Sequence, residues 1–74
     1  MVTVYSTPSC PWCHKAKDYL KEKNVVFDDV DVSVDESRVD EMFKKSGQMG
    51  VPVIDINGKI IVGFDVVAID EALL

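Results

Sequence analysis

The two cysteines of this 74-residue chain lie three positions apart, in the segment Cys10-Pro11-Trp12-Cys13. Because no other cysteine is present, the pair closes only a very small loop and cannot act as a disulfide framework for the fold. The same spacing suits a reversible disulfide, in which one thiolate attacks a partner and its neighbour resolves the mixed disulfide. The motif therefore indicates a redox site rather than a structural bridge.

The motif stands between a segment with the pattern of a strand and one with the pattern of a helix. Residues 2–5 are β-branched and aromatic, and residues 15–23 carry apolar side chains at helical spacing between charged ones. Cys10 therefore falls near a helix N-terminus, where unpaired backbone N–H groups and the helix dipole favour a thiolate. In C-x-x-C sites with this placement, the pKa of the first thiol falls from about 8.5 to about 3.5–7.5. Lys15 and Lys17 would add to this effect.

The composition and charge of the chain indicate a globular domain and exclude several classes of protein. The 74 residues are 47% apolar and 28% charged, as expected for one globular domain spanning residues 1–74. Eight basic side chains against 13 acidic ones give a net charge of −5, which speaks against nucleic acid as the main partner. The sequence has no apolar run of about 18 residues and no basic leader followed by a cleavage site. We therefore expect a soluble monomer of the cytoplasm.

The middle of the chain predicts a second strand and a second helix. Residues 25–27 are apolar on both faces, as in a strand covered by helices on each side, and the aspartates within 28–31 indicate that it frays toward water. Ser33 and Glu36 have the S-x-x-E spacing of a capping box, which predicts the start of a helix. The inner stripe of that helix would consist of Val39, Met42 and Phe43.

The last third of the chain predicts a β-hairpin and a short helix. Residues 53–56 and 59–62 are rich in β-branched residues, and the Asn57-Gly58 pair between them is typical of a two-residue type I′ turn. Asp65 is a candidate N-cap for a final helix. Its inner face would carry Val66, Ile69 and Leu73. The element order is therefore β-α-β-α-β-β-α, with a right-handed crossover between the first two strands.

Three motifs together give the chain a family resemblance. Cys10-Pro11-Trp12-Cys13 follows the first strand, Val51-Pro52 precedes the hairpin, and Gly63-Phe64-Asp65 follows it. In this order and spacing the motifs resemble the glutaredoxin family over essentially the whole chain. The resemblance implies an α/β architecture, the minimal thioredoxin fold, with three helices around a four-stranded mixed sheet in the order 2-1-3-4. It also implies a thiol–disulfide oxidoreductase that reduces glutathione mixed disulfides and protein disulfides.

The resemblance also implies roles for individual residues. Cys10 would be the nucleophile and Cys13 the resolving thiol, with no bound cofactor and with glutathione as co-substrate. Gln48 would help to hold the glycine carboxylate of glutathione, and the Val51 backbone would pair with its cysteine part as an added β-strand does. The remaining contacts would come from Trp12, from Pro52 in the cis form, and from the γ-glutamyl-binding segment Gly63, Phe64 and Asp65.

The sequence departs from the usual glutathione-binding pattern at several places. Residues 6–9 lack the basic residue that typically precedes the first cysteine, and Met49 stands where a further basic residue is common. Val62 and Val66 replace a glycine and an acidic residue around the Gly-Phe pair. A Gly-Phe at this place resembles the redoxins that give electrons to ribonucleotide reductase and are reduced by thioredoxin reductase. Such a redoxin is the first alternative.

Cysteines at this spacing also occur in metal and haem sites, which are further alternatives. Monothiol-type relatives hold an iron–sulfur cluster between two protomers with glutathione as co-ligand, although Pro11 and the second cysteine argue against such a module here. Zinc usually takes four N or S ligands, and only His14 remains to assist the pair. The segment 10–14 also has the C-x-x-C-H spacing of a c-type haem attachment site, which the flanking strands argue against. An inert pair of buried thiols is the remaining alternative.

Overall fold

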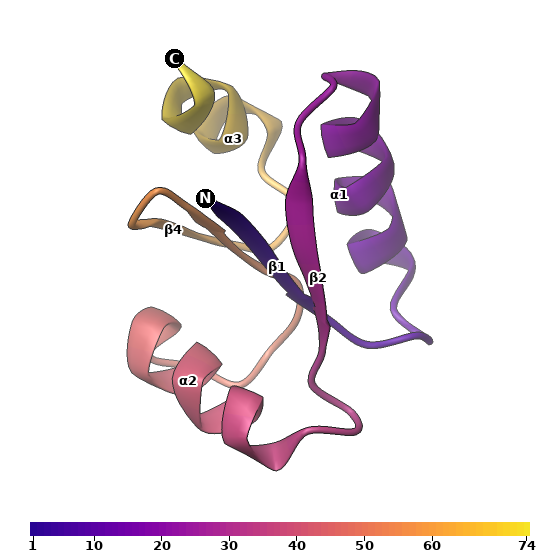
Figure 1. Cartoon of the computed structure of the whole chain (residues 1–74), viewed down its shortest axis with the longest axis vertical. Coiled ribbons are helices and arrows are strands. Elements are labelled where there is room, and N and C mark those ends of the chain that lie inside the picture. Colours follow the sequence, from indigo (N-terminus) through magenta and orange to yellow (C-terminus); the bar gives the residue numbers. More distant parts are fainter.

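The computed structural model describes all 74 residues and contains three helices and four strands in the predicted order (Figure 1). The elements are β1 (Val2–Ser6), α1 (Pro11–Glu22), β2 (Phe27–Asp31), α2 (Glu36–Ser46), β3 (Val53–Ile56), β4 (Lys59–Val62) and α3 (Val66–Leu73). None of the helices combines the length and the apolar composition that a membrane span requires.

The strands form one mixed sheet in the order β2-β1-β3-β4, which confirms the predicted thioredoxin-like fold. β1 pairs in parallel with β2 and antiparallel with β3, and β3 pairs antiparallel with β4. In the β1–β3 ladder Tyr5 lies opposite Val53. The chain that leaves β1 and the chain that enters β3 therefore meet at one end of the sheet. This topology brings the cysteine motif close to Val51 and Pro52.

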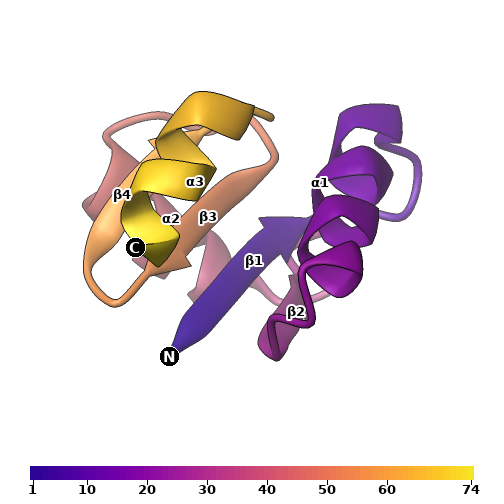
Figure 2. The same cartoon turned by 90° about the horizontal axis from the view of Figure 1, so that it is seen from above.

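The helices cover both faces of the sheet. Strand side chains alternate between the two faces, so each face has its own set of apolar residues to bury. α1 and α3 lie on one face and α2 lies on the other (Figures 1 and 2). The buried residues of the α1/α3 face are Val2, Val4, Ala16, Leu20, Ile54, Ile56, Ile61 and Ile69. Those of the α2 face are Tyr5, Val30, Val32, Met42 and Val53. The prediction of a sheet covered on both sides is confirmed.

The predicted start of the second strand is wrong by two residues. The backbone N–H of Val25 donates to the Leu20 carbonyl oxygen at 2.9 Å, so Val25 belongs to the turn that ends α1. Val26 is 91% exposed, and the strand begins at Phe27. Asp28 and Asp29 are exposed to water as predicted, but the strand does not lose its pairing, because β2 pairs with β1 as far as Asp31.

The start of α2 differs from the predicted capping box. Ser33 does not cap the helix, because its hydroxyl donates to the Asp31 carboxylate at 2.5 Å. Asp35 is the N-cap instead, and its carboxylate accepts the Ser37 N–H at 3.1 Å. α2 therefore begins at Glu36, inside the predicted box rather than at its first residue.

Two predicted core positions are also wrong. In α2 Met42 is buried, but Phe43 is 48% exposed, because the small α2 core does not extend to it. In α3 Ile69 is buried, whereas Val66 is exposed. Ala68, Ala72 and Leu73 pack against the core beside Ile69.

The hairpin agrees with the prediction. Asn57 and Gly58 have φ values of +52° and +95°, as a type I′ turn requires at both central positions. The Asp55 carboxylate accepts the Gly58 N–H at 2.9 Å and so fixes the turn from within β3. The N-terminal ammonium also contacts the Asn57 side-chain oxygen, which ties the hairpin to the start of β1.

Candidate active site

Cys10 occupies the N-cap position of α1. Its backbone is extended, with φ −96° and ψ 109°, and its sulfur accepts the backbone N–H of Cys13 at 3.1 Å. A serine or aspartate oxygen commonly takes this place, so the sulfur replaces a hydrogen-bond acceptor at a helix N-terminus. Pro11 is the first helical residue, where its missing N–H leaves nothing unpaired. The position favours negative charge on the partly exposed Cys10 sulfur.

Cys13 differs from Cys10 in its surroundings. Its side chain is completely buried on the inner face of α1, and both cysteines are free thiols. Burial raises the pKa of Cys13 to about 11, and the hydrogen bond with Cys10 acts in the same direction. The backbone N–H of Thr7 and the ammonium of Lys17 act against this rise and lower the pKa of Cys13. The two thiols are therefore unequal, one accessible and one held protonated.

The loop before β3 forms the opposite wall of the site. The Val51–Pro52 peptide bond is cis, as predicted. The Val51 carbonyl oxygen lies 3.9 Å from the Cys10 sulfur, which donates to it. The Pro52 carbonyl accepts the Gly63 N–H at 2.8 Å, and Gly63 has a φ of +83° that favours glycine. The cysteine motif, the Val-Pro segment and the Gly-Phe segment are thus joined by direct contacts.

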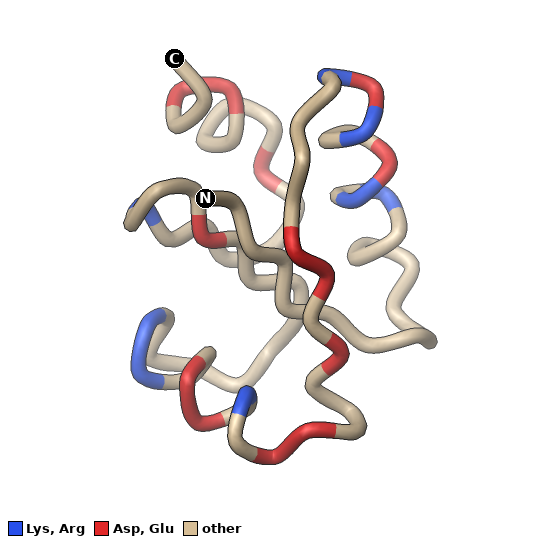
Figure 3. Tube along the Cα trace, in the orientation of Figure 1, with Lys and Arg blue, Asp and Glu red and all other residues tan.

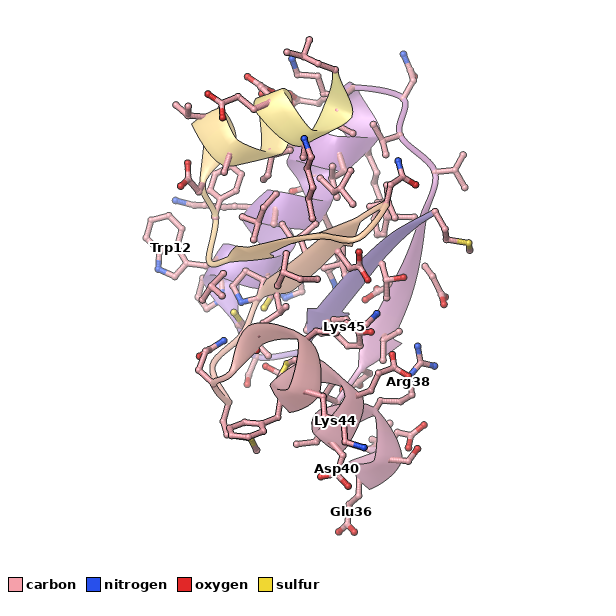
Figure 4. The ribbon with its side chains drawn as sticks, turned by 90° about the vertical axis from the view of Figure 1, so that its left-hand side faces the viewer. Trp12, Glu36, Arg38, Asp40, Lys44 and Lys45 are labelled. Carbon is pink, nitrogen blue, oxygen red and sulfur yellow. The ribbon has the colours of Figure 1, made fainter.

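A pocket of about 280 Å³ opens between these segments, lined by Trp12, Val51, Pro52, Gly63 and Phe64. Trp12 is 57% exposed, and its ring lies 6.4 Å from that of Phe64. Figure 4 shows the indole projecting away from the ribbon at the edge of the molecule. All five lining residues were predicted as contacts for glutathione from the sequence.

Gln48 and Asp65 do not line the pocket. The Gln48 side chain folds back on the loop, where its amide nitrogen donates to the Gly50 carbonyl at 2.9 Å and its oxygen accepts the Gly50 N–H at 2.6 Å. The Asp65 carboxylate accepts the Ala68 N–H at 3.1 Å, which confirms its prediction as the N-cap of α3. Their predicted contacts with a ligand stay predictions.

The lining of the pocket contains no cationic side chain. The Lys15 ammonium lies 4.6 Å from the centre of the Trp12 ring, and Met49 is 59% exposed. Lys17 pairs with Asp29 at 3.2 Å on the sheet side of α1. Along the chain, α1 and α2 carry both basic and acidic residues, whereas the charged residues of β2 and of the segment after it are all acidic (Figure 3).

Three residues near the cysteines were not singled out from the sequence. The backbone of Thr7 lowers the pKa of Cys13, and Ser6 donates to Asp29 at 3.0 Å beside Lys17. Backbone donors carry no side-chain signal, so nothing in the sequence marks Thr7. The other two become neighbours only because β1 and β2 pair in parallel, which places Val4 opposite Asp29.

The comparisons with known proteins agree with this geometry. The glutaredoxin family model matches residues 2–61. A glutaredoxin-like 8.6 kDa protein of the rubredoxin operon of Clostridium pasteurianum is 53% identical over 73 residues, which cover 99% of this chain and 97% of that protein. Glutaredoxin 3 of Escherichia coli K12 is 38% identical over 64 residues, 86% of this chain and 77% of that protein.

A solved structure shares the whole architecture. The thioredoxin-like protein BC3987 superposes with a TM-score of 0.90 at 26% identity, over 97% of this chain and 99% of that one. The match in sequence and fold covers the segments that carry both cysteines and the Val-Pro loop. The chain therefore belongs to the glutaredoxin family of thiol–disulfide oxidoreductases.

Proposed function

We propose that the protein reduces glutathione mixed disulfides and protein disulfides, with Cys10 as the nucleophile and Cys13 as the resolving thiol. The observation that carries this proposal is the inequality of the two thiols, because Cys10 is accessible at a helix N-cap while Cys13 is completely buried. The Cys10 thiolate attacks one sulfur of the substrate disulfide and expels the other as a thiolate. Cys13 or a glutathione molecule then attacks the Cys10 sulfur and releases the bound thiol.

Glutathione is the co-substrate in this proposal. The pocket beside Cys10 offers the Val51 carbonyl and an apolar wall of Trp12 and Phe64, which suits a short extended peptide joined through its sulfur. The reaction moves two electrons between sulfur atoms and needs no bound prosthetic group. We propose that the protein acts in this way as a monomer in the cytoplasm.

A second candidate is a redoxin that takes electrons from thioredoxin reductase and gives them to ribonucleotide reductase. Glutathione carries two carboxylates, but the pocket lining has no cation to pair with them. The Gln48 amide is already bonded at both ends to Gly50, and Met49 offers no charge. These features favour weak affinity for glutathione and a protein as reductant.

The test compares two electron sources on one glutathionylated peptide: glutathione with its reductase, and thioredoxin reductase. Turnover with glutathione would support the first candidate, whereas turnover only with thioredoxin reductase would replace it with the second. In the first case Cys13→Ser keeps the reduction of glutathione mixed disulfides and loses the reduction of protein disulfides. Equal loss of both activities would contradict the assigned roles.

Two further measurements bear on the co-substrate. If glutathione is the reductant, Met49→Arg should lower its KM, since a guanidinium beside the pocket supplies a partner for a carboxylate. An unchanged KM would mean that Met49 does not face the ligand. A brown colour after anaerobic purification would instead favour an iron–sulfur module.

A further inference from the structure

Lys17 is held differently from the other lysines of α1. Its ammonium donates to the Asp29 carboxylate at 3.2 Å and to the Ser6 hydroxyl at 3.5 Å, and Ser6 in turn donates to Asp29 at 3.0 Å. The Lys17 side chain is only 14% exposed, whereas Lys15 and Lys21 are exposed residues. Two strands therefore fix this one ammonium against the sheet.

The residue that carries this fixed ammonium lies about one helical turn after the resolving thiol. Lys17 follows Cys13 by four residues in α1, so the two side chains are neighbours on one face of the helix. Ser6 and Asp29 lie on the sheet face that α1 covers, because Ser6 has the same alternation as the buried Val4 and Asp29 lies opposite Val4 in the ladder. The cluster thus lies between α1 and the sheet, on the face of the helix that also carries the completely buried Cys13.

Few groups determine the charge state of Cys13. Burial is the largest influence and raises its pKa, and the Cys10 sulfur raises it further through a hydrogen bond and through its charge. The backbone N–H of Thr7 and the Lys17 ammonium lower the pKa of Cys13. Asp29 is the acidic group in contact with Lys17, and the neighbouring His14 is bonded to the Pro8 carbonyl at 2.8 Å.

The balance among these groups changes during the reaction. When Cys10 forms a mixed disulfide its sulfur loses its charge, so two of the influences that keep Cys13 protonated disappear. Among the influences named above, burial then still raises the pKa of Cys13, and the Thr7 N–H and the Lys17 ammonium still lower it. We propose that Lys17, fixed by Ser6 and Asp29, is a positioning residue for the resolving step, because it favours the Cys13 thiolate once Cys10 is joined to a partner. This inference rests on the proposed role of Cys13 as the resolving thiol.

The step balances without another reagent. Cys13 loses its proton to water, and its thiolate attacks the Cys10 sulfur of the mixed disulfide. The Cys10–Cys13 bond forms while the bond from Cys10 to the partner breaks, and the partner sulfur leaves as a thiolate that takes a proton from water. Lys17 supplies only charge, so it does not enter the bond changes, and it affects the closing step more than the first attack.

The test uses the full chain and the chromogenic disulfide dithiobis(nitrobenzoic acid). Reduced protein should release one coloured thiolate when Cys10 attacks and a second when Cys13 closes the ring, as two phases in stopped flow. We expect Lys17→Gln to slow the second phase by up to about threefold at neutral pH and to slow the first phase less. Each tenfold fall in the thiolate fraction is partly offset, by about threefold, by the greater nucleophilicity of a more basic thiolate.

Matched variants separate charge from structure. Lys17→Arg should retain the wild-type second phase, and Lys21→Gln, which removes an exposed charge from the same helix, should leave both phases unchanged. In a Cys10→Ser background, the pH midpoint of thiolate absorbance of Cys13 should rise when Lys17 becomes Gln. Equal second phases in Lys17→Gln and Lys21→Gln, or a Lys17→Arg variant as slow as Lys17→Gln, would overturn the inference.

The chromogenic reagent keeps this test apart from the proposed function. It reacts with an accessible thiolate whatever the natural reductant is, so a protein that shows both phases but no turnover with glutathione would refute only the glutathione proposal. A wild-type protein that releases a single coloured thiolate would show that Cys13 does not resolve, and would overturn the role of Lys17 together with that of Cys13.

Discussion

The two faces of the sheet hold their helices by different means. The α1/α3 face buries eight apolar residues, and α1, which carries both cysteines, is fixed there by Ala16 and Leu20. The α2 face buries five residues, of which Met42 alone comes from the helix. A site that must keep Cys10 opposite Val51 is therefore built on the more thoroughly packed helix. Because α2 contributes only one buried side chain to its core, contacts other than apolar packing must help to hold it on the sheet.

That attachment is a polar network at the C-terminal half of α2. The Lys45 ammonium donates to the Asp55 carboxylate at 2.7 Å and to the Tyr5 hydroxyl at 2.8 Å, and Tyr5 donates to Glu41. The bond to Asp55 is the main reason why the pKa of Lys45 is raised. Figure 4 shows Lys45 turned toward the sheet, whereas Glu36 projects away from it. Polar contacts thus supplement a small apolar core on this face.

The largest expected losses of stability come from truncating one buried side chain in each core. Leu20→Ala should lower the free energy of unfolding by about 3 kcal/mol and Met42→Ala by about 2 kcal/mol. The cost is smaller at Met42 because the partly buried Val39 and Val51 lie beside the small core and can move into the space. Urea unfolding monitored by circular dichroism measures both, with Val26→Ala at an exposed position as the control. An equal or larger loss for Met42→Ala would refute the ranking of the two faces.

Removing one tyrosine hydroxyl from each face of the sheet should change the free energy of unfolding less, but should distinguish the two faces more clearly. Tyr5 is completely buried and its hydroxyl joins Glu41 and Lys45, so Tyr5→Phe should cost about 1 kcal/mol. Tyr19 on the α1 side donates to Asp70 at 2.5 Å from a partly exposed position, and Tyr19→Phe should leave stability unchanged because water replaces the contact. Thermal unfolding of the two variants compares them directly, and similar losses would show that the polar network does not hold α2.

Local sequence signals predicted much of the fold, and competing signals explain the errors. The Asn57-Gly58 turn and the Asp65 cap depend on residues within a few positions, and both are confirmed. Ser33 and Asp35 are both candidate N-caps of α2. Asp35 caps the helix because the Ser33 hydroxyl is already bonded to Asp31. Helical spacing equally fits Phe43 as core, but the narrow α2 core leaves it half exposed.

The site shows the same division between local and long-range information. The Cys10 cap follows from the strand-to-helix boundary, and the approach of Val51 follows once the order of strands is known. The contacts of Lys17 with Asp29 depend on the β1–β2 register and on how α1 lies across it, which no local pattern specifies. Gln48 bonds within its own loop, a local contact that the sequence did not indicate, and its contact with a ligand stays a prediction.

The smallest expected effect is an acid sensitivity confined to the α2 face. The hydrogen bond from Tyr5 holds the pKa of Glu41 below its usual range. A lowered folded-state pKa adds stability above the unfolded value of about 4.3, which is lost as the pH falls through the folded value. Glu41 is partly exposed, so the contribution is about 0.5 kcal/mol. The loss of unfolding free energy from pH 7 to pH 3 should therefore be smaller in Glu41→Gln than in the wild type. Glu71→Gln, an exposed substitution on α3, should lose as much unfolding free energy between pH 7 and pH 3 as the wild type. Equal losses in Glu41→Gln and Glu71→Gln would show that another group causes the acid sensitivity.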